Sequence, residues 1–426
     1  MKKIKLFQLL TCFVIAEIGS AQNTTSSPYS SFGLGDLEEQ LLTPQMAMGH
    51  TKYGWADPSF LNIANPASHS TIVTPIFDLS LAVNAISLTN ETSSADFSNT
   101  YFRNVVLGLP LKGSWGMSLG LIPYSKVGYD TKSTQNDSEL GNVDYIYQGS
   151  GGLNQFFWGN GINIHSDSLQ QLSIGINTGF IFGSINRNRF VFPDANSGTF
   201  NVTSQNDNFM KGFSFNAGLM YNIKINEKLK IGIGTTYELS TKLNAIQTNL
   251  EHTFAGNQIA DTISFDSLTG KISVPEKINI GLSTVIDGKW TLMLDYSTQD
   301  WSKFNSLNNS NEGLVKQSQL AFGLQFLHDA KDLKLVRRTR YRIGSRFNNT
   351  NLNIGEQLKE FGITFGLGIP LKFRGGISSS LNVSGEFGQR GVSSSTIVKE
   401  QFSRWMVGFS FTPDFHDRWF AKRKIN

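Results

Sequence analysis

The sequence predicts an all-β fold: a transmembrane antiparallel β-barrel of about 14 strands, with an N-terminal hatch in its lumen. Three observations lead to this prediction. Apolar residues alternate with small ones along most of the chain. Only 16% of the 426 residues are charged, against about 25% in ordinary soluble domains. The chain also opens with a segment typical of export signals.

The first residues have the layout of a secretory signal peptide. Lysines precede an apolar run over residues 6–18, and small residues follow up to Ala21. The run is shorter than the roughly 20 residues that a helical membrane span needs. We therefore expect a signal peptide over residues 1–21. The single cysteine, Cys12, lies within it, so the mature chain would have neither disulfides nor thiol chemistry.

Residues 22–75 lack the alternation of the rest of the chain and are rich in Ser, Pro and Gly. Such a segment is either a disordered linker or a plug folded into the lumen. Trp55, Phe60, Leu61 and Ile63 are apolar side chains that favour burial. We therefore expect residues 22–75 to form a hatch.

Residues 76–412 repeat a period of two, the signal of β-strands. Ile231, Ile233 and Tyr237 share one face of a predicted strand, while Gly232 and Gly234 share the other. A soluble sandwich would place Lys, Glu and Arg on the second face, where it meets bulk water. Here that face carries Gly, Ser, Thr and Asn, which suit a confined lumen. The alternative to a membrane barrel is a large secreted β protein.

The alternation and the turn residues indicate about fourteen strands. They are expected near residues 76–88, 101–110, 114–129, 143–158, 170–189, 209–225, 228–245, 272–286, 289–303, 317–328, 335–348, 358–371, 376–388 and 400–412. Short turns such as Asp287-Gly288 alternate with polar excursions at 190–208, 246–271 and 304–316. Outer-membrane barrels have short periplasmic turns and long outer loops.

Several stretches resemble, in their order, the FadL (long-chain fatty acid transporter) family. Asn65-Pro66-Ala67 is similar to a motif of that family's hatch. Residues 115–124, ending in Pro123-Tyr124, are similar to its kinked third strand, and residues 275–304 are similar to a later hairpin. The resemblance covers most of the chain, and it implies a barrel of about 14 strands closed by a hatch.

The resemblance also implies a function: an outer-membrane channel for passive uptake of hydrophobic compounds such as long-chain fatty acids. In the family, ligands leave sideways at the kink, which corresponds here to Pro123 and Tyr124. A proline cannot donate a ladder hydrogen bond, so the strand bends or opens there. The alternative is a simple bulge near the rim. Ser125 and Lys126 depart from the family pattern, because a glycine often follows the Pro-aromatic pair.

The two ends of the mature chain resemble those of Bacteroidetes outer-membrane proteins. That group uses FadL-like barrels as accessory or plug subunits of its type 9 secretion translocon. The alternative function is therefore a non-transporting barrel subunit of such an assembly. The basic tail, residues 413–426, would lie in the periplasm, where Trp419 and Phe420 are candidates for docking a partner. Its alternative role is a strap under the barrel rim.

Arg338, Arg340 and Arg342 fall on one face of the strand predicted over residues 335–348. Arginine facing lipid would cost about 2–4 kcal/mol each, so these residues should face the lumen or lie outside the membrane band. Their functional role would be contact with a carboxylate or another anion. We favour instead a structural ladder with hatch carboxylates. Examples of such carboxylates are Asp36, Glu38 and Glu39.

The sequence points to no enzyme, cofactor or metal site. The six histidines are scattered, and no Gly-x-Ser-x-Gly motif occurs. His252 and Ser264 are the nearest candidates for a barrel lipase, without a supporting motif. The net charge of +4 indicates no nucleic-acid partner. We expect location in a Gram-negative outer membrane, contact with its lipid and lipopolysaccharide, and a hydrophobic ligand or a secretion translocon as partner.

Overall fold

The computed structural model describes residues 25–91, 93–194, 198–256, 258–307, 310–371, 379–393 and 397–412. The predicted signal peptide (1–21) and the tail (413–426) lie outside these residues. Among the described residues, no helix combines the length and apolar character that crossing a membrane requires.

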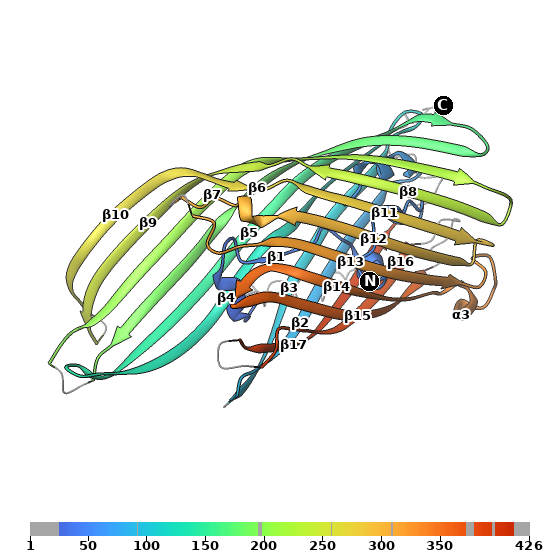
Figure 1. The fold of residues 1–426 in the computed structure, drawn as a ribbon. Helices are drawn as coiled ribbons and strands as arrows, with labels where there is room; N and C mark the ends of the chain where they lie inside the picture. The colour runs from blue at the N-terminus through green and yellow to red at the C-terminus, as the bar shows by residue number, and fades with distance from the viewer. Residues whose placement is uncertain are drawn as a thin grey trace, which may run out of the picture.

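A single antiparallel sheet closes on itself to form the barrel (Figure 1). β2 (Ile76–Thr89) pairs with β3 (Ser94–Pro110) on one side and with β17 (Lys399–Phe411) on the other. The remaining unbroken wall strands follow in chain order. They are β4 (Trp115–Asp137), β5 (Gly141–Ser166), β6 (Gln170–Phe192), β7 (Asn201–Lys224), β12 (Trp290–Asp300), β13 (Lys316–Leu327), β14 (Arg340–Ile354), β15 (Glu356–Leu371) and β16 (Ser379–Arg390).

Two wall strands are each broken in the middle. β8 (Leu229–Glu238) and β9 (Thr241–Ala255) both run along β7, one after the other. β10 (Gln258–Val274) and β11 (Lys277–Ile286) run along β9 and β8 in the same way. With each broken pair counted as one strand and the inner β1 left out, the wall has fourteen strands. The predicted fold class is confirmed.

The outer surface of the barrel is apolar and the inner surface is polar or small. On β12, Leu292, Leu294 and Tyr296 are exposed, whereas Met293 and Asp295 between them are buried. Outward-facing aliphatic and aromatic side chains continue this pattern around the barrel and form the apolar belt that lipid requires. The apolar face therefore points outward, as the alternation predicts.

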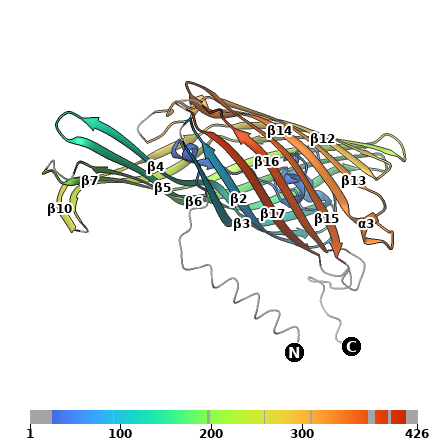
Figure 2. The same cartoon turned by 90° about the horizontal axis from the view of Figure 1, so that it is seen from below.

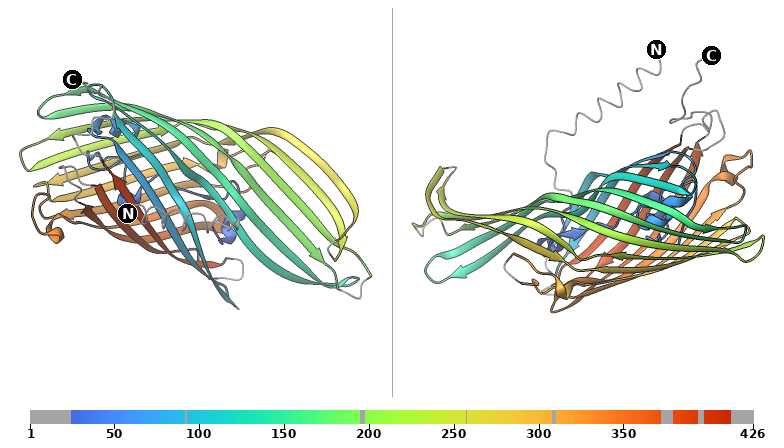
Figure 3. Two further views of the ribbon diagram at one scale, coloured as in Figure 1. Left: turned by 180° about the vertical axis from the view of Figure 1, so that it is seen from behind. Right: turned by 90° about the horizontal axis from the view of Figure 1, so that it is seen from above.

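Several strands extend well beyond the others at one end of the barrel (Figure 3). We call this the upper end, and the end where β2 begins and β17 ends the lower end. The polar excursions predicted at 190–208 and 246–271 are wrong, because β6, β7, β9 and β10 continue through most of them. Above the apolar belt neither face of a strand needs apolar residues. The sequence of these strand ends therefore has the polar composition that is typical of loops.

The N-terminal segment, residues 25–75, is largely buried and surrounded by the wall (Figure 2). Its elements are short. They are η1 (Pro28–Ser31), β1 (Asp36–Leu37), α2 (Thr43–Met46) and η2 (Pro66–Thr71). Outside this segment, η3 (Trp301–Lys303) follows β12, and α3 (Leu335–Arg338) lies in the turn between β13 and β14.

Candidate functional site

The lower part of the N-terminal segment, residues 42–70, lies on inward-facing glycines that we call the glycine ring. A Cβ atom added to Gly281 would lie 2.5 Å from the amide nitrogen of Gly54, and one added to Gly323 would lie 2.6 Å from the carbonyl oxygen of Met48. Backbone therefore approaches backbone as closely as only glycine allows. The ring consists of Gly116, Gly161, Gly175, Gly218, Gly234, Gly281, Gly323, Gly344, Gly366 and Gly408, each on a different strand.

Asn65, Pro66 and Ala67 join the segment to the wall. The Asn65 side chain accepts a hydrogen bond from the Ala67 amide (3.1 Å) and so caps η2. Its amide group donates to the carbonyl oxygens of Tyr53 (2.8 Å) and Leu219 (3.3 Å). All three residues are buried. The motif thus ties two stretches of the segment to β7.

A carboxylate on the wall holds the same part of the segment. One Asp295 oxygen accepts hydrogen bonds from the backbone amides of Lys52 (2.6 Å) and Tyr53 (2.9 Å). Asp295 is buried on the inner face of β12. An acidic residue at an inward position of the alternation is the sequence signal for it, although alternation alone does not reveal its partners.

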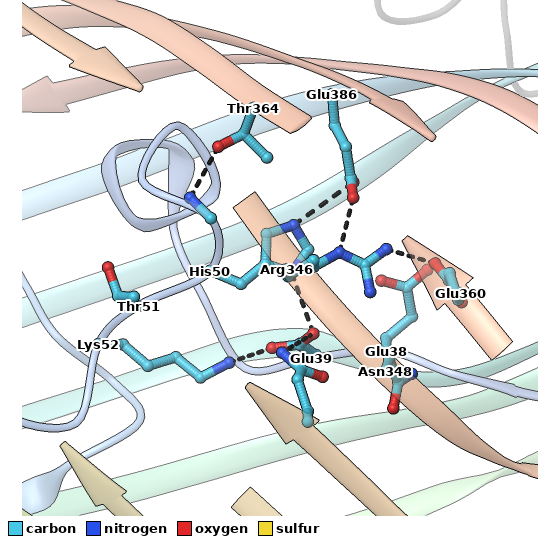
Figure 4. A network of polar contacts seen from close by, with 12 residues as sticks. Glu38, Glu39, His50, Thr51, Lys52, Arg346, Asn348, Glu360, Thr364 and Glu386 are labelled. Atoms are coloured by element: carbon cyan, nitrogen blue, oxygen red, sulfur yellow. Dashed lines mark hydrogen bonds and ion pairs between the residues drawn. The ribbon is translucent and has the colours of Figure 1, made fainter. Parts of the chain in front are cut away.

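Above the glycine ring, charges of the segment meet charges of the wall in a buried ion cluster (Figure 4). His50 lies 2.9 Å from Glu39 and 3.4 Å from Glu386, and Lys52 forms an ion pair with Glu39. The cluster consists of Glu39, His50, Lys52, Arg346, Glu360, Glu386, Arg390 and Arg404. His50 adopts a left-handed backbone (φ 70°), which is uncommon outside glycine. Of these residues, sequence reasoning singled out only Glu39, as a hatch carboxylate.

The wall supplies most of the cluster. Arg346 pairs with Glu386 (2.6 Å) and with Glu360. Glu360 also accepts from Arg390 (3.1 Å) and Arg404 (3.1 Å). Buried ionic groups are tolerated only when each has partners, because the desolvation of each ion costs several kcal/mol. The cluster therefore depends on complete pairing.

The wall itself has a gap beside the cluster. The β3–β4 ladder ends at Val105 and Leu121. Two residues later β4 has a register shift between Pro123 and Ser125 against β5, which leaves Tyr124 as the extra residue of a bulge. The predicted kink residues therefore lie at a real irregularity of the strand, next to the point where the two strands separate.

The N-terminal segment occupies this β3–β4 gap. β1 pairs with β4 through Asp36 and Lys126, and the Glu38 amide donates to the Tyr124 carbonyl (2.9 Å). Glu38 pairs with Arg103 of β3 (2.7 Å) and with Lys126 of β4, so one carboxylate bridges both edges. Burial alone would raise the pKa of Glu38, but the two cations outweigh it and lower the pKa to about 2. The bridge is therefore ionic.

Apolar side chains of the segment and the wall pack together in the upper part of the lumen, beside a cavity of about 310 Å³ that Leu34, Met210 and Phe304 border. Tyr29 and Leu34 of the segment pack in one buried cluster with wall residues such as Leu153, Ile185 and Trp301. We call it the upper apolar cluster. The glycine ring, the ion cluster and the upper apolar cluster form three successive layers in the lumen. Along β14, Gly344 belongs to the first layer, Arg346 to the second and Leu352 to the third.

A cavity of about 190 Å³ remains beside the ion cluster. It is bordered by charged side chains that include Glu38, Arg103, Lys126, Glu360 and Arg404. Sites for hydrophobic ligands are lined mainly by apolar and aromatic side chains. This cavity has a mixed lining, because apolar and aromatic side chains such as Leu41, Tyr101 and Met406 border it together with the charged ones.

Arg338 lies in a different element from Arg340 and Arg342. Arg338 lies in α3, because β14 begins only at Arg340, so the prediction that all three share one strand face is wrong. Arg340 and Arg342 lie over the Phe60 ring at 4.7 and 5.1 Å, and Arg342 donates to Gln325 (2.8 Å). The expected pairing with Asp36, Glu38 and Glu39 is also wrong. Those carboxylates pair with other cations, as Asp36 does with Arg390, Glu38 with Arg103 and Lys126, and Glu39 with Lys52 and His50.

Two further predictions concern chemistry outside this network. Trp419 and Phe420 lie outside the described residues. Among the described residues, no group of His, Cys, Asp and Glu is arranged to hold a metal ion.

His69 lies close to Ser118 (2.9 Å) and Asn177 (3.2 Å), but both contact the same ring nitrogen. A catalytic triad uses both nitrogens, so this arrangement does not form one.

Comparisons with known proteins agree with the barrel. The toluene transporter TodX of Pseudomonas putida is 18% identical over 90% of this chain and 100% of that chain, with a TM-score of 0.58. The toluene transporter TbuX of Ralstonia pickettii is 13% identical over 88% and 98%, with a TM-score of 0.56. A FadL homologue of Pseudomonas aeruginosa is 12% identical over 90% and 100%, with a TM-score of 0.56. At these identities the similarity establishes the fold.

No curated protein matches this sequence. A family model described as BamG matches residues 1–426. Since that match covers all residues of the sequence studied, the chain belongs to the BamG family and has the fold of the FadL-like channels.

Proposed function

We propose that the chain is a plugged barrel of a Gram-negative outer membrane, conducting no solute and serving as a subunit of a larger outer-membrane assembly. The observation that carries the proposal is the filling of the lumen in three successive layers. The glycine ring, the ion cluster and the upper apolar cluster each join the N-terminal segment to the wall. On this proposal residues 25–75 act as a permanent hatch.

Energetics favour a closed lumen. A ligand passing through would have to separate Glu39 from Lys52 and Glu38 from Arg103. Breaking one buried ion pair costs about 3–5 kcal/mol when the partner charge stays buried. A hydrophobic ligand offers no replacement for the lost partners. The layered lumen is thus poorly suited to passing apolar compounds.

The similarity of the mature chain's ends to Bacteroidetes outer-membrane proteins favours an assembly of that group, such as the type 9 secretion translocon. The strands that extend beyond the others at the upper end could contact a partner protein. Ile259, Ile263 and Phe265 of β10 are more than half exposed there. Large exposed apolar side chains that gather on one element mark contact surfaces.

A second candidate function is favoured by the β3–β4 gap and by the shared fold with hydrocarbon channels. In that case the chain is a passive channel for hydrophobic compounds such as long-chain fatty acids. Displacement of β1 would open a sideways exit at Pro123 and Tyr124. Lys126 and Arg103 would then line the exit without a counter-ion.

One experiment separates the two functions. The chromosomal gene is tagged for purification from native membranes, and uptake of labelled fatty acid and toluene is measured in a deletion strain. Recovery of a stoichiometric assembly with uptake unchanged supports the plugged subunit. Loss of uptake on deletion, with a chain that purifies alone, contradicts it and establishes the channel.

A further inference from the structure

The turn between β13 and β14, residues 328–339, differs from the other described turns at the lower end of the barrel. It is long and contains α3. Leu333, Leu335 and Val336 are 90%, 48% and 69% exposed. Three exposed aliphatic side chains in four residues are unusual for a turn in water, so something apolar is expected to cover them.

The contacts of the turn place it against the outer surface of the barrel. The hydroxyl of Tyr341 donates to the carbonyl oxygen of Val336 (3.1 Å). Tyr341 and Ile343 belong to the outward, lipid-facing side of β14, at 38% and 53% exposure. Val336 therefore continues the apolar belt at its lower edge and does not lie beneath the lumen.

Interfacial aromatic residues mark this level. Trp290 packs against Phe326 with ring centroids 4.4 Å apart, on the two strands that precede the turn. Trp and Tyr concentrate where lipid headgroups meet the hydrocarbon region. The turn thus begins at the membrane–water interface.

Cations alternate with the aliphatic residues of the turn. Lys331, Lys334 and Arg337 are exposed, and Leu333 and Val336 are three positions apart, as are Lys334 and Arg337. The turn is ordered by its own bonds, since Asp332 pairs with Arg337 (3.0 Å) and the Asp329 amide donates to the Arg337 carbonyl (3.0 Å). Long basic side chains extend to headgroups while apolar neighbours enter the acyl region.

We infer that residues 328–339 form an interfacial anchor that binds phospholipids of the periplasmic leaflet. Leu333 and Val336 enter the acyl chains, and Lys331 and Lys334 contact headgroup phosphates. Continuity with the apolar belt and the charge of the turn identify lipid as the partner. The inference requires that the barrel spans the outer membrane with its lower end toward the periplasm, so it holds for either function proposed above.

Site-directed fluorescence tests the insertion. The only cysteine, Cys12, lies in the predicted signal peptide, so an introduced cysteine is a unique label in the mature chain. L333C and V336C are labelled with bimane and reconstituted, as the full mature barrel, into bilayers containing lipids with brominated acyl chains. I343C in the belt and S267C on the exposed part of β10 are the positive and negative controls.

We expect quenching of L333C and V336C at about half or more of the I343C level, with S267C nearly unaffected. Quenching no stronger than that of S267C would place the turn in water and overturn the inference.

Native mass spectrometry tests the headgroup contacts with phosphatidylglycerol as the probe. The double variant K331Q/K334Q should retain about half as much lipid as the wild type, or less. The matched control K112Q/K228Q removes the same charge from exposed lysines in other turns at the lower end. Equal losses in the two double variants would show an effect of net charge alone, and would contradict a specific site.

Discussion

The glycine ring and the ion cluster hold the same N-terminal segment by different physical means. At most glycines of the ring, backbone lies against backbone, and at the others a small side chain such as that of Ala47 or Thr43 lies there, so the contact depends on shape. In the cluster, carboxylates pair with Lys and Arg side chains, and the contact depends on pairing. A steric contact with a backbone atom has no substitute, whereas a charge can be removed together with its partner. The two layers should therefore respond differently to second-site changes.

The largest effect is expected in the ion cluster. Glu360→Gln removes the charge that Arg346, Arg390 and Arg404 share. Leaving buried cations without a counter-ion should lower the free energy of unfolding by about 3–5 kcal/mol. Urea unfolding followed by tryptophan fluorescence and heat-modified gel migration measures it. Glu356→Gln, at the exposed start of the same strand, is the control and should change it by less than about 0.5 kcal/mol. Equal effects would mean that the cluster contributes no stability.

The glycine ring should give a loss that no neighbour can relieve. Gly344→Val places side-chain atoms against the Gly49 amide nitrogen and the Met48 carbonyl carbon and should cost about 3 kcal/mol in the same assay. Adding Met48→Ala should not restore stability, because the clash is with the backbone. Gly270→Ala, whose nearest neighbour is the flexible end of Leu307, is the control. Rescue by Met48→Ala would contradict a backbone contact.

The bridge across the β3–β4 gap should behave in the opposite way. Glu38→Gln should cost about 2 kcal/mol, because Arg103 and Lys126 lose a shared partner. Adding Lys126→Gln should recover part of this loss, with a coupling of about 1 kcal/mol in a double-mutant cycle. Strictly additive effects would show that the two side chains do not interact.

The smallest expected effect is the pH dependence of the stability that Glu38 contributes. The pKa of Glu38 is lowered to about 2 in the folded chain, from an ordinary value of 4.5. Its contribution is therefore complete above pH 4.5 and is lost as the pH falls toward 2. The stability difference between wild type and Glu38→Gln should be constant from pH 8 to pH 5 and shrink below pH 4.5. A difference that already shrinks near pH 6 would contradict an ionic bridge.

Much of the fold was predictable because a period of two is visible in any single strand. The inward position of Gly232 and Gly234 followed from the same alternation, although the reason for glycine did not. Gly234 is needed because the Tyr53 carbonyl lies against it, and Tyr53 is far away in sequence. The upper ends of β6, β7, β9 and β10 were not predicted, because apolar residues mark only the part of a strand that faces lipid.

The candidate site was less predictable. Asp36, Glu38 and Glu39 were expected to pair with the arginines of residues 338–342, but Asp36 pairs with Arg390, which is 354 positions away. Such pairs depend on barrel register and on the path of the segment, and neither is encoded in local sequence. Arg338 was misplaced because a helical turn of four residues has no periodicity long enough to recognise.

The glycine ring also constrains the order of assembly. Residues 42–70 touch strands around the whole circumference, up to Thr43 against Gly408 on the last strand. A closed wall with backbone contacts of this kind has no room to admit Trp55 or Phe60 afterwards. We therefore expect the segment, which precedes the wall strands in the chain, to act as a template on which those strands find their register. Joining of β2 to β17 would then be the final step of folding.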